Sequence, residues 1–261
     1  MPEALVKIFG ERNSGTKLLR QIISRNSSSL LWPGTTKEIR ESHQTEAAAR
    51  YGDVDLDGRD SVMFQEYLAD EMFDRCFDIS LGWKHAAPSP NRIIENARYR
   101  DTSFIVISKN PYAWLLSLYR SPHHNLLAGN MKSFSTFLRK PWLTTRRDNA
   151  PGIFASPIEL WNYKYRAYIE FSNIAKITFI RYEDVLENPA VVFSTGGILL
   201  SSDEPLDIPQ HSLNGGAIDF DTYRKMYSES FWFERINRVD TEAIGQSLDH
   251  RVLDHLGYGA T

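Results

Sequence analysis

The chain has 261 residues, of which 42% are hydrophobic, the normal share for a globular protein with a buried core. Its formal net charge of -3 argues against a general nucleic-acid-binding protein, whose binding face would be strongly basic. No apolar run approaches the roughly 18 residues that span a bilayer, and Met1 to Phe9 is too short for a secretory signal. We therefore expect a cytoplasmic protein without an integral membrane segment. Its oligomeric state is left open.

The single cysteine, Cys76, cannot form an internal disulfide, and a lone cysteine excludes a zinc site built from cysteines. A reducing compartment is consistent with this. Because free cysteines are among the most buried residue types, we expect Cys76 to be a small core residue and not a catalytic thiol.

Apolar runs rich in β-branched and aromatic residues alternate with helical patterns along the chain. Strands are predicted at Leu5 to Phe9, Ile79 to Trp83, Phe104 to Ile107 and Ile177 to Ile180. Helices are predicted at Thr16 to Arg25, Met63 to Phe73, from Pro90 after Ser89 as cap, Tyr112 to Tyr119, Glu159 to Phe171 and Thr241 to Leu256. This alternation predicts an α/β fold of three layers, a central parallel sheet flanked by helices. No internal repeat is present, and residues 1–261 are expected to form one domain.

Two segments interrupt this alternation, at Ser121 to Pro157 and at Ser201 to Gly216. Long excursions from an α/β sheet tend to carry substrate specificity, so we expect these segments to shape an acceptor pocket. The pair His123-His124 lies in the first of them, and it could line such a pocket or lie in a solvated loop.

The segment from Gly10 to Lys17 follows the first strand and opens the first helix, which is where a phosphate-binding loop belongs. Gly10 and Gly15 allow the backbone to wrap around an anion, and Thr16 adds a hydroxyl donor. The glycine spacing equals that of a Walker A loop. The magnesium-binding hydroxyl that follows the Walker A lysine is missing, because Leu18 follows Lys17.

A second candidate anion site follows the strand at Phe104 to Ile107. Lys109 stands at the tip of this strand, Pro111 starts a helix, and Ser117 lies two turns into that helix. A kinase would usually place an acid at the end of this strand to hold magnesium. A cation there indicates a second anion instead.

With these motifs, the chain resembles the family of sulfotransferases that use 3′-phosphoadenosine 5′-phosphosulfate (PAPS). The segment Arg12-Asn13-Ser14-Gly15-Thr16 is similar to the family's 5′-phosphosulfate loop. Lys109-Asn110-Pro111 with Ser117 is similar to its 3′-phosphate motif, Arg-Asn-Pro with a serine eight residues later. The stretch Ile177 to Pro189, with Tyr182-Glu183-Asp184, is similar to the family's strand followed by Tyr-Glu-Asp and a helix. The ending Leu256-Gly257-Tyr258 is similar to that of bacterial and carbohydrate members.

The resemblance implies a P-loop NTPase-like fold and sulfuryl transfer from PAPS, without a metal, to a hydroxyl or amine of a small molecule or glycan. The product would be 3′-phosphoadenosine 5′-phosphate (PAP). It implies cofactor contacts from Arg12, Asn13, Ser14, Gly15, Thr16, Lys17, Leu18, Lys109, Ser117 and Tyr182. Tyr182 could stack on the adenine or be a buried aromatic residue. Glu183 and Asp184 are expected to cap the following helix.

Two departures concern cations. Lys109 replaces the family's arginine, which keeps the charge but loses bidentate geometry. Asn13 occupies the place of the lysine or arginine that many members have directly before Ser-Gly-Thr, where it stabilises the leaving phosphate. Arg12 and Lys17 flank that position, and either could take this catalytic role.

His85 is the candidate general base, because a histidine near neutral pH suits proton transfer and the family has a histidine after this strand in many members. Lys84 beside it could contact the cofactor or the sulfuryl group. Glu11, within the loop, is the reserve base. Two alternatives remain open: a P-loop kinase of nucleotides or metabolites with Asp184 as a distant Walker B acid, and a catalytically silent glycan- or nucleotide-binding protein.

Overall fold

The computed structural model describes residues 4–42, 62–122, 131, 133–202, 204–209 and 220–259. A parallel sheet contains β1 (Leu5–Phe9), β2 (Leu30–Leu31), β3 (Thr102–Ser108) and β6 (Ile177–Arg181), and an antiparallel pair contains β4 (Trp142–Leu143) and β5 (Ile153–Phe154). The helices are α1 (Thr16–Asn26), α2 (Thr36–Ser42), α4 (Val62–Arg75), α5 (Phe77–Ser80), α6 (Pro90–Ile94), η1 (Tyr99–Asp101), α7 (Pro111–Arg120), α8 (Phe134–Leu138), η2 (Arg146–Asp148), α9 (Pro157–Phe171), α10 (Tyr182–Glu187), α11 (Val191–Gly196), α12 (Phe220–Ser228), α13 (Trp232–Arg235), α14 (Arg238–Ser247) and α15 (His250–His255).

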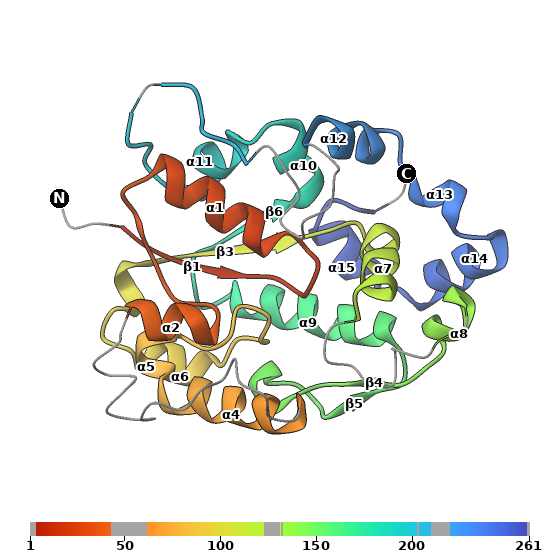
Figure 1. Ribbon diagram of the computed structural model, residues 1–261, viewed down its shortest axis with the longest axis horizontal. Coiled ribbons are helices and arrows are strands. Elements are labelled where there is room, and N and C mark those ends of the chain that lie inside the picture. The colour runs from red at the N-terminus through yellow and green to blue at the C-terminus, as the bar shows by residue number, and fades with distance from the viewer. Residues whose placement is uncertain are drawn as a thin grey trace.

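The parallel sheet lies between two layers of helices, which confirms the predicted α/β fold. Figure 1 shows α1, α10 and α11 on one side of the strands, and α9, α5 and α6 on the other. Every residue of β1 is buried, as is nearly all of β3, because helices cover both faces of these parallel strands. Three of the four strands were therefore recognisable as short apolar runs.

The strand order in the sheet is β2-β1-β3-β6. The connection after β1 leads to one side of that strand and the later connections lead to the other side, so the topological switch point lies between β1 and β3. The two strands pair in parallel from Leu5 opposite Thr102 to Phe9 opposite Val106. Ligands of open α/β sheets bind beyond the carboxyl ends of the strands at such a switch point. Both candidate anion sites, after β1 and after β3, begin at this point.

The predicted strand at Ile79 to Trp83 is wrong. Residues 77–80 form the short helix α5, and Leu81 (φ 54°) and Gly82 (φ 85°) are left-handed, which excludes an extended strand. Lys7 on β1 explains this turn, because its buried Nζ donates to the carbonyls of Pro33, Ser80 and Gly82 at 3.2, 2.6 and 2.5 Å. The fourth strand is instead β2, whose two residues are too short to give a sequence pattern.

The predicted helix at Thr241 to Leu256 is two helices. Leu248 is extended and ends α14, and the Asp249 side chain accepts a hydrogen bond from the amide of Arg251 and caps α15. Cys76 is fully buried, as expected. Within the described ranges, none of the helices combines the length and apolar character that a bilayer crossing requires.

Candidate functional site

The loop after β1 has the form of an anion cradle. Gly15 is left-handed (φ 101°), and a Cβ atom there would lie 2.4 Å from the Tyr182 ring, so only glycine fits this position. Ser14 does not cap α1, because its hydroxyl donates to the Glu11 carbonyl at 2.5 Å. Among the described residues, the amides of Gly15 and Thr16 meet no protein acceptor. These amides at the start of α1 are donors suited to a phosphate or sulfate.

Arg12 and Glu11 belong to a buried charge network beneath this cradle. Arg12 donates to both carboxylate oxygens of Asp148 at 3.2 and 3.1 Å and to Glu11 at 3.0 Å. Lys164 on α9 donates to Asp148 at 2.8 Å. All four side chains are at most 2% exposed. Glu11 is thus enclosed by cations inside the protein, which is a poor position for a base that must reach an acceptor.

The ionisation of this network follows from its charges. Burial alone would lower the pKa of Arg12, but Asp148 and Glu11 raise it above its ordinary value. Burial alone would raise the pKa of Asp148, but Arg12 and Lys164 hold it well below its ordinary value. The network therefore contains two carboxylates and two cations. Arg12 is held by its ion pairs with Asp148 and Glu11.

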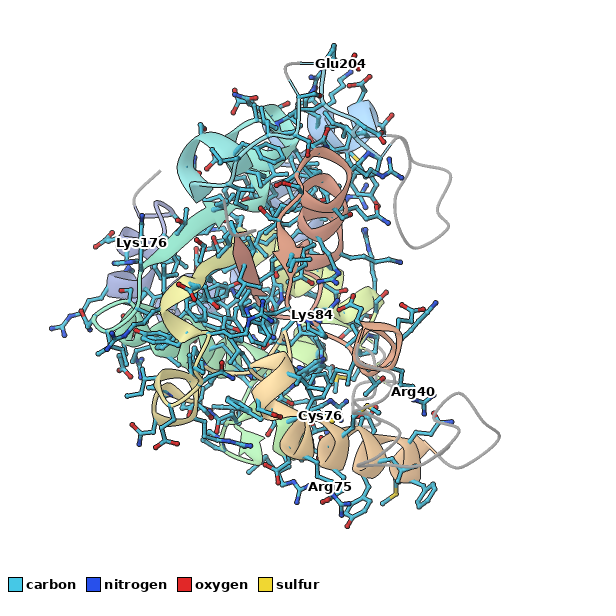
Figure 2. All side chains as sticks on the ribbon, turned by 90° about the vertical axis from the view of Figure 1, so that its left-hand side faces the viewer. Arg40, Arg75, Cys76, Lys84, Lys176 and Glu204 are labelled. Atoms are coloured by element: carbon cyan, nitrogen blue, oxygen red, sulfur yellow. The ribbon has the colours of Figure 1, made fainter. Side chains whose placement is uncertain are left out.

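Lys17 and Lys84 are two further cations near the cradle. Lys17 is exposed in the first turn of α1, and Lys84 lies near the middle of the molecule in Figure 2. Burial lowers the pKa of Lys84, and the neighbouring charges of Arg20 and Lys17 lower it further, while Glu38 opposes them. The charge of Lys17 thus acts on Lys84. Asn13, left-handed at φ 63°, donates its side-chain amide to the Ser121 carbonyl at 3.1 Å.

His85 lies directly beneath the cradle, although no strand delivers it there. Its Nδ1 is 2.6 Å from the Gly10 carbonyl, and a carbonyl only accepts, so Nδ1 carries the proton. Nε2 is then the basic nitrogen of the neutral ring. Lys164 donates to the His85 carbonyl at 2.7 Å, and the Ala87 amide donates to the Asp148 carbonyl at 2.9 Å. The charge network therefore also holds the backbone of the candidate base.

The structure brings Lys109 and Ser117 together, as the motif predicts. Lys109 Nζ donates to Ser117 Oγ at 3.0 Å, and it lies over the rings of Tyr182 and Tyr227, 4.7 and 5.0 Å from their centroids. Burial lowers the pKa of Lys109 to about 8. Within the described ranges no carboxylate forms an ion pair with this ammonium. Tyr182 lies between Lys109 and Gly15 and so joins the two anion sites.

Glu183 and Asp184 do not cap α10, contrary to expectation. Glu183 accepts from the Asn110 amide at 2.9 Å and from the Tyr258 hydroxyl at 2.8 Å, which ties the end of β3 to the last described residues. Asp184 pairs through both oxygens with Arg181 at 2.8 and 2.5 Å. A carboxylate held in this way is not a free magnesium ligand. No group of three His, Cys, Asp or Glu side chains in the described part of the chain could hold a metal ion.

A cavity of about 200 Å³ is lined by residues of α4, α5 and η2 and by Trp83, Ala86 and Ala87. Its aromatic surfaces are already covered. Arg12 and Arg147 lie over Trp83, 4.4 and 4.5 Å from the ring centroid, and Arg92 lies 4.0 Å from that of Phe77. This cavity consequently offers little free aromatic surface to a sugar ring. His123-His124 lies outside the described residues, as do residues 203 and 210–216 of the second excursion.

Sequence reasoning missed three residues of this region: Asp148, Lys164 and Tyr227. Asp148 follows two arginines in an irregular segment, where an acid normally reads as a surface charge. Lys164 lies among the aromatic residues of α9, and this apolar setting was the one available signal that it is buried. Tyr227 lies on α12, and nothing in the sequence relates that helix to Lys109.

No protein-family model matches the chain, and no curated protein matches its sequence. Solved structures that are similar to it include two sulfotransferases. A sulfotransferase from Alicyclobacillus acidocaldarius is 13% identical, with 100% of this chain and 98% of that chain covered at a TM-score of 0.46. A mouse sulfotransferase complexed with PAP is 13% identical, with 95% and 91% covered at a TM-score of 0.42. The chain is thus similar to sulfotransferase structures over nearly its whole length, at low sequence identity.

Proposed function

We propose that the chain transfers a sulfuryl group from PAPS to a hydroxyl or amine of an acceptor, with a glycan as the expected class. The observation that carries this proposal is the pairing of two anion sites at the switch point between β1 and β3. One is the cradle at Gly15 and Thr16, and the other is the Lys109 ammonium with Ser117. A nucleotide with phosphate-type groups at both its 5′ and 3′ positions matches this pair. Residues 1–261 would act as one domain, in the cytoplasm.

In this proposal each group has a separate task. The amides of the cradle hold the 5′-phosphosulfate, and Tyr182 borders the nucleotide between the two sites. Lys17 is exposed at the start of α1 and is the better placed cation for the leaving phosphate, because Arg12 is bound to Asp148 and Glu11. His85 accepts the acceptor's proton at Nε2. Sulfuryl transfer then needs mainly alignment and charge balance, as phosphoryl transfer does.

Nucleotide discrimination tests the proposal directly. PAP should bind at least about 100-fold more tightly than adenosine 5′-phosphate, because two hydrogen bonds to the charged 3′-phosphate contribute roughly 1.5 to 3 kcal/mol each. Replacing Lys109 and Ser117 together with alanine should remove most of this preference. Isothermal titration calorimetry in the presence of a chelator measures both affinities and also shows whether a divalent metal is required.

The matched control is Lys176→Ala, because Lys176 is an exposed lysine at the edge of the molecule, just before β6 (Figure 2). It should keep the wild-type preference. Equal wild-type affinity for the two nucleotides would overturn the assignment. PAP binding that appears only with magnesium would favour the kinase alternative, and binding without transfer to any acceptor would favour the silent binding protein.

The preference for the 3′-phosphate should also depend on pH. Burial and the charge of Arg120 lower the pKa of Lys109 to about 8, against the opposing charge of Glu183. Above that pH the free protein loses the ammonium that the anion needs, so PAP affinity should fall about tenfold between pH 7 and pH 9. The affinity for adenosine 5′-phosphate should not share this loss. Calorimetry across this pH range measures the effect.

Lys109→Arg is the control for this experiment, because a guanidinium stays charged throughout the range. Its PAP affinity should be nearly constant from pH 7 to pH 9. The same decline in the arginine variant would assign the titration to another group.

A further inference from the structure

Tyr227 reaches the second anion site from a different part of the chain. It lies on α12, while Lys109 follows β3 and Ser117 lies on α7. Its ring packs edge-on against Tyr182, with centroids 5.1 Å apart, and Lys109 Nζ lies 5.0 Å from its centroid. Only 6% of Tyr227 is exposed. A phenol group is thus buried at the site where the proposed function needs donors.

The Tyr227 side chain also acts on Ser117, which binds Lys109. Burial raises the pKa of Tyr227 well above its ordinary value, and a hydrogen bond with the Ser117 side chain acts in the opposite direction. Ser117 also accepts from Lys109 at 3.0 Å and donates to the Ala113 carbonyl at 2.9 Å. One serine hydroxyl is therefore adjacent to both the ammonium and the phenol. Lys109, Ser117 and the Tyr227 ring therefore lie at one site.

This arrangement suits a group with several acceptor oxygens. A buried phenol normally needs a hydrogen-bond partner, and a phosphate oxygen is a stronger acceptor than a serine hydroxyl. A phosphate has three terminal oxygens, so it can accept from the ammonium and the phenol at once, and also from the serine when the Ser117 hydroxyl turns from the Ala113 carbonyl to the phosphate. The negative charge of Glu183 and the positive charge of Arg120 both act on Lys109. The cluster therefore combines two cations with one carboxylate and is rich in donors.

We propose that the Tyr227 hydroxyl is a third ligand of the 3′-phosphate, and that α12 thereby takes part in recognising this group. The inference rests on the proposed function, because it assigns the same nucleotide to the site. It adds a binding residue from an element that no motif connects with the nucleotide. Tyr227 would discriminate between nucleotides with and without a 3′-phosphate, while its ring supports Lys109.

The test compares Tyr227→Phe with the wild type, because phenylalanine keeps the ring and removes only the hydroxyl. PAP affinity should fall about tenfold, as expected for one hydrogen bond to a charged group. Adenosine 5′-phosphate affinity should stay the same. Tyr223→Phe, one turn earlier on α12, removes a hydroxyl from a half-buried tyrosine and should change neither affinity. Calorimetry measures the affinities, and thermal unfolding verifies that both variants are folded.

Three results would overturn the inference. If Tyr227→Phe binds PAP as tightly as the wild type while the wild type still prefers PAP, the inference alone fails. An equal loss of affinity for both nucleotides would assign Tyr227 a purely structural role. If the wild type does not distinguish the two nucleotides, the proposed function fails together with the inference.

Discussion

Asp148→Asn is expected to lower the free energy of unfolding by about 3 to 5 kcal/mol, the cost of removing one partner from a buried ion pair. Asparagine has nearly the same shape, so the packing is retained while one negative charge is lost. Arg12 and Lys164, which donate to the Asp148 carboxylate at 3.1 and 2.8 Å, would keep a buried positive charge that Glu11 alone cannot balance. Urea denaturation followed by tryptophan fluorescence measures the change.

Asp221→Asn is the matched control, because Asp221 forms an ion pair with Arg224 but is 82% exposed. It should change stability by less than about 1 kcal/mol. The pH dependence gives an independent measure. Since the folded-state pKa of Asp148 is depressed, its contribution is present above the unfolded value near 3.8 and is lost as pH falls through the lower folded value. A difference from the wild type that persists unchanged in strong acid would contradict this explanation.

His85→Asn should lower turnover by about 10² or more, the usual contribution of a general base. Asparagine is the informative replacement, because its side-chain amide can still donate to the Gly10 carbonyl as His85 Nδ1 does at 2.6 Å. The cradle is then preserved while the basic Nε2 is removed. PAP affinity should be nearly unchanged. Steady-state transfer from PAPS measures turnover, and calorimetry measures binding.

His250→Asn controls for the loss of an imidazole at an exposed position, and it should leave turnover unchanged. Wild-type turnover in His85→Asn would transfer the role of base to another group. A loss of PAP affinity equal to the loss of turnover would instead show that His85 only supports the cradle.

The anion-binding part of the candidate site could be predicted because phosphates require recognisable local features. Gly15 must be glycine for a local reason, since its backbone is left-handed and close to Tyr182. Lys109 and Ser117 are joined by a strand end and one helix, so eight residues of sequence determine their proximity. The same holds for the strands at Leu5 to Phe9 and Ile177 to Ile180, which appear as short apolar runs bounded by helical patterns.

The support of the site depends on contacts between distant parts of the chain. The strand expected at Ile79 to Trp83 does not form, because Lys7, more than seventy residues earlier, takes the carbonyls of Ser80 and Gly82. The strand propensity of residues 79–83 depends only on neighbouring residues, so it cannot predict hydrogen bonds from Lys7. The sequence predicts Arg12 as a cation that could act on the leaving phosphate. In the structure it binds Asp148, which lies 136 residues later in the chain.

The sequence by itself therefore determined the layered α/β fold, the order of the two anion motifs and the backbone freedom at Gly15. These properties follow from periodicity and from residues that are close in the chain. Only the tertiary structure decided that Arg12 and Glu11 are buried in a charge network, that His85 Nδ1 faces the Gly10 carbonyl and that Tyr227 lies beside Lys109. Each depends on burial or on a partner from a distant element, and burial changes the charge, hydrogen bonding and accessibility of a side chain without changing its local sequence.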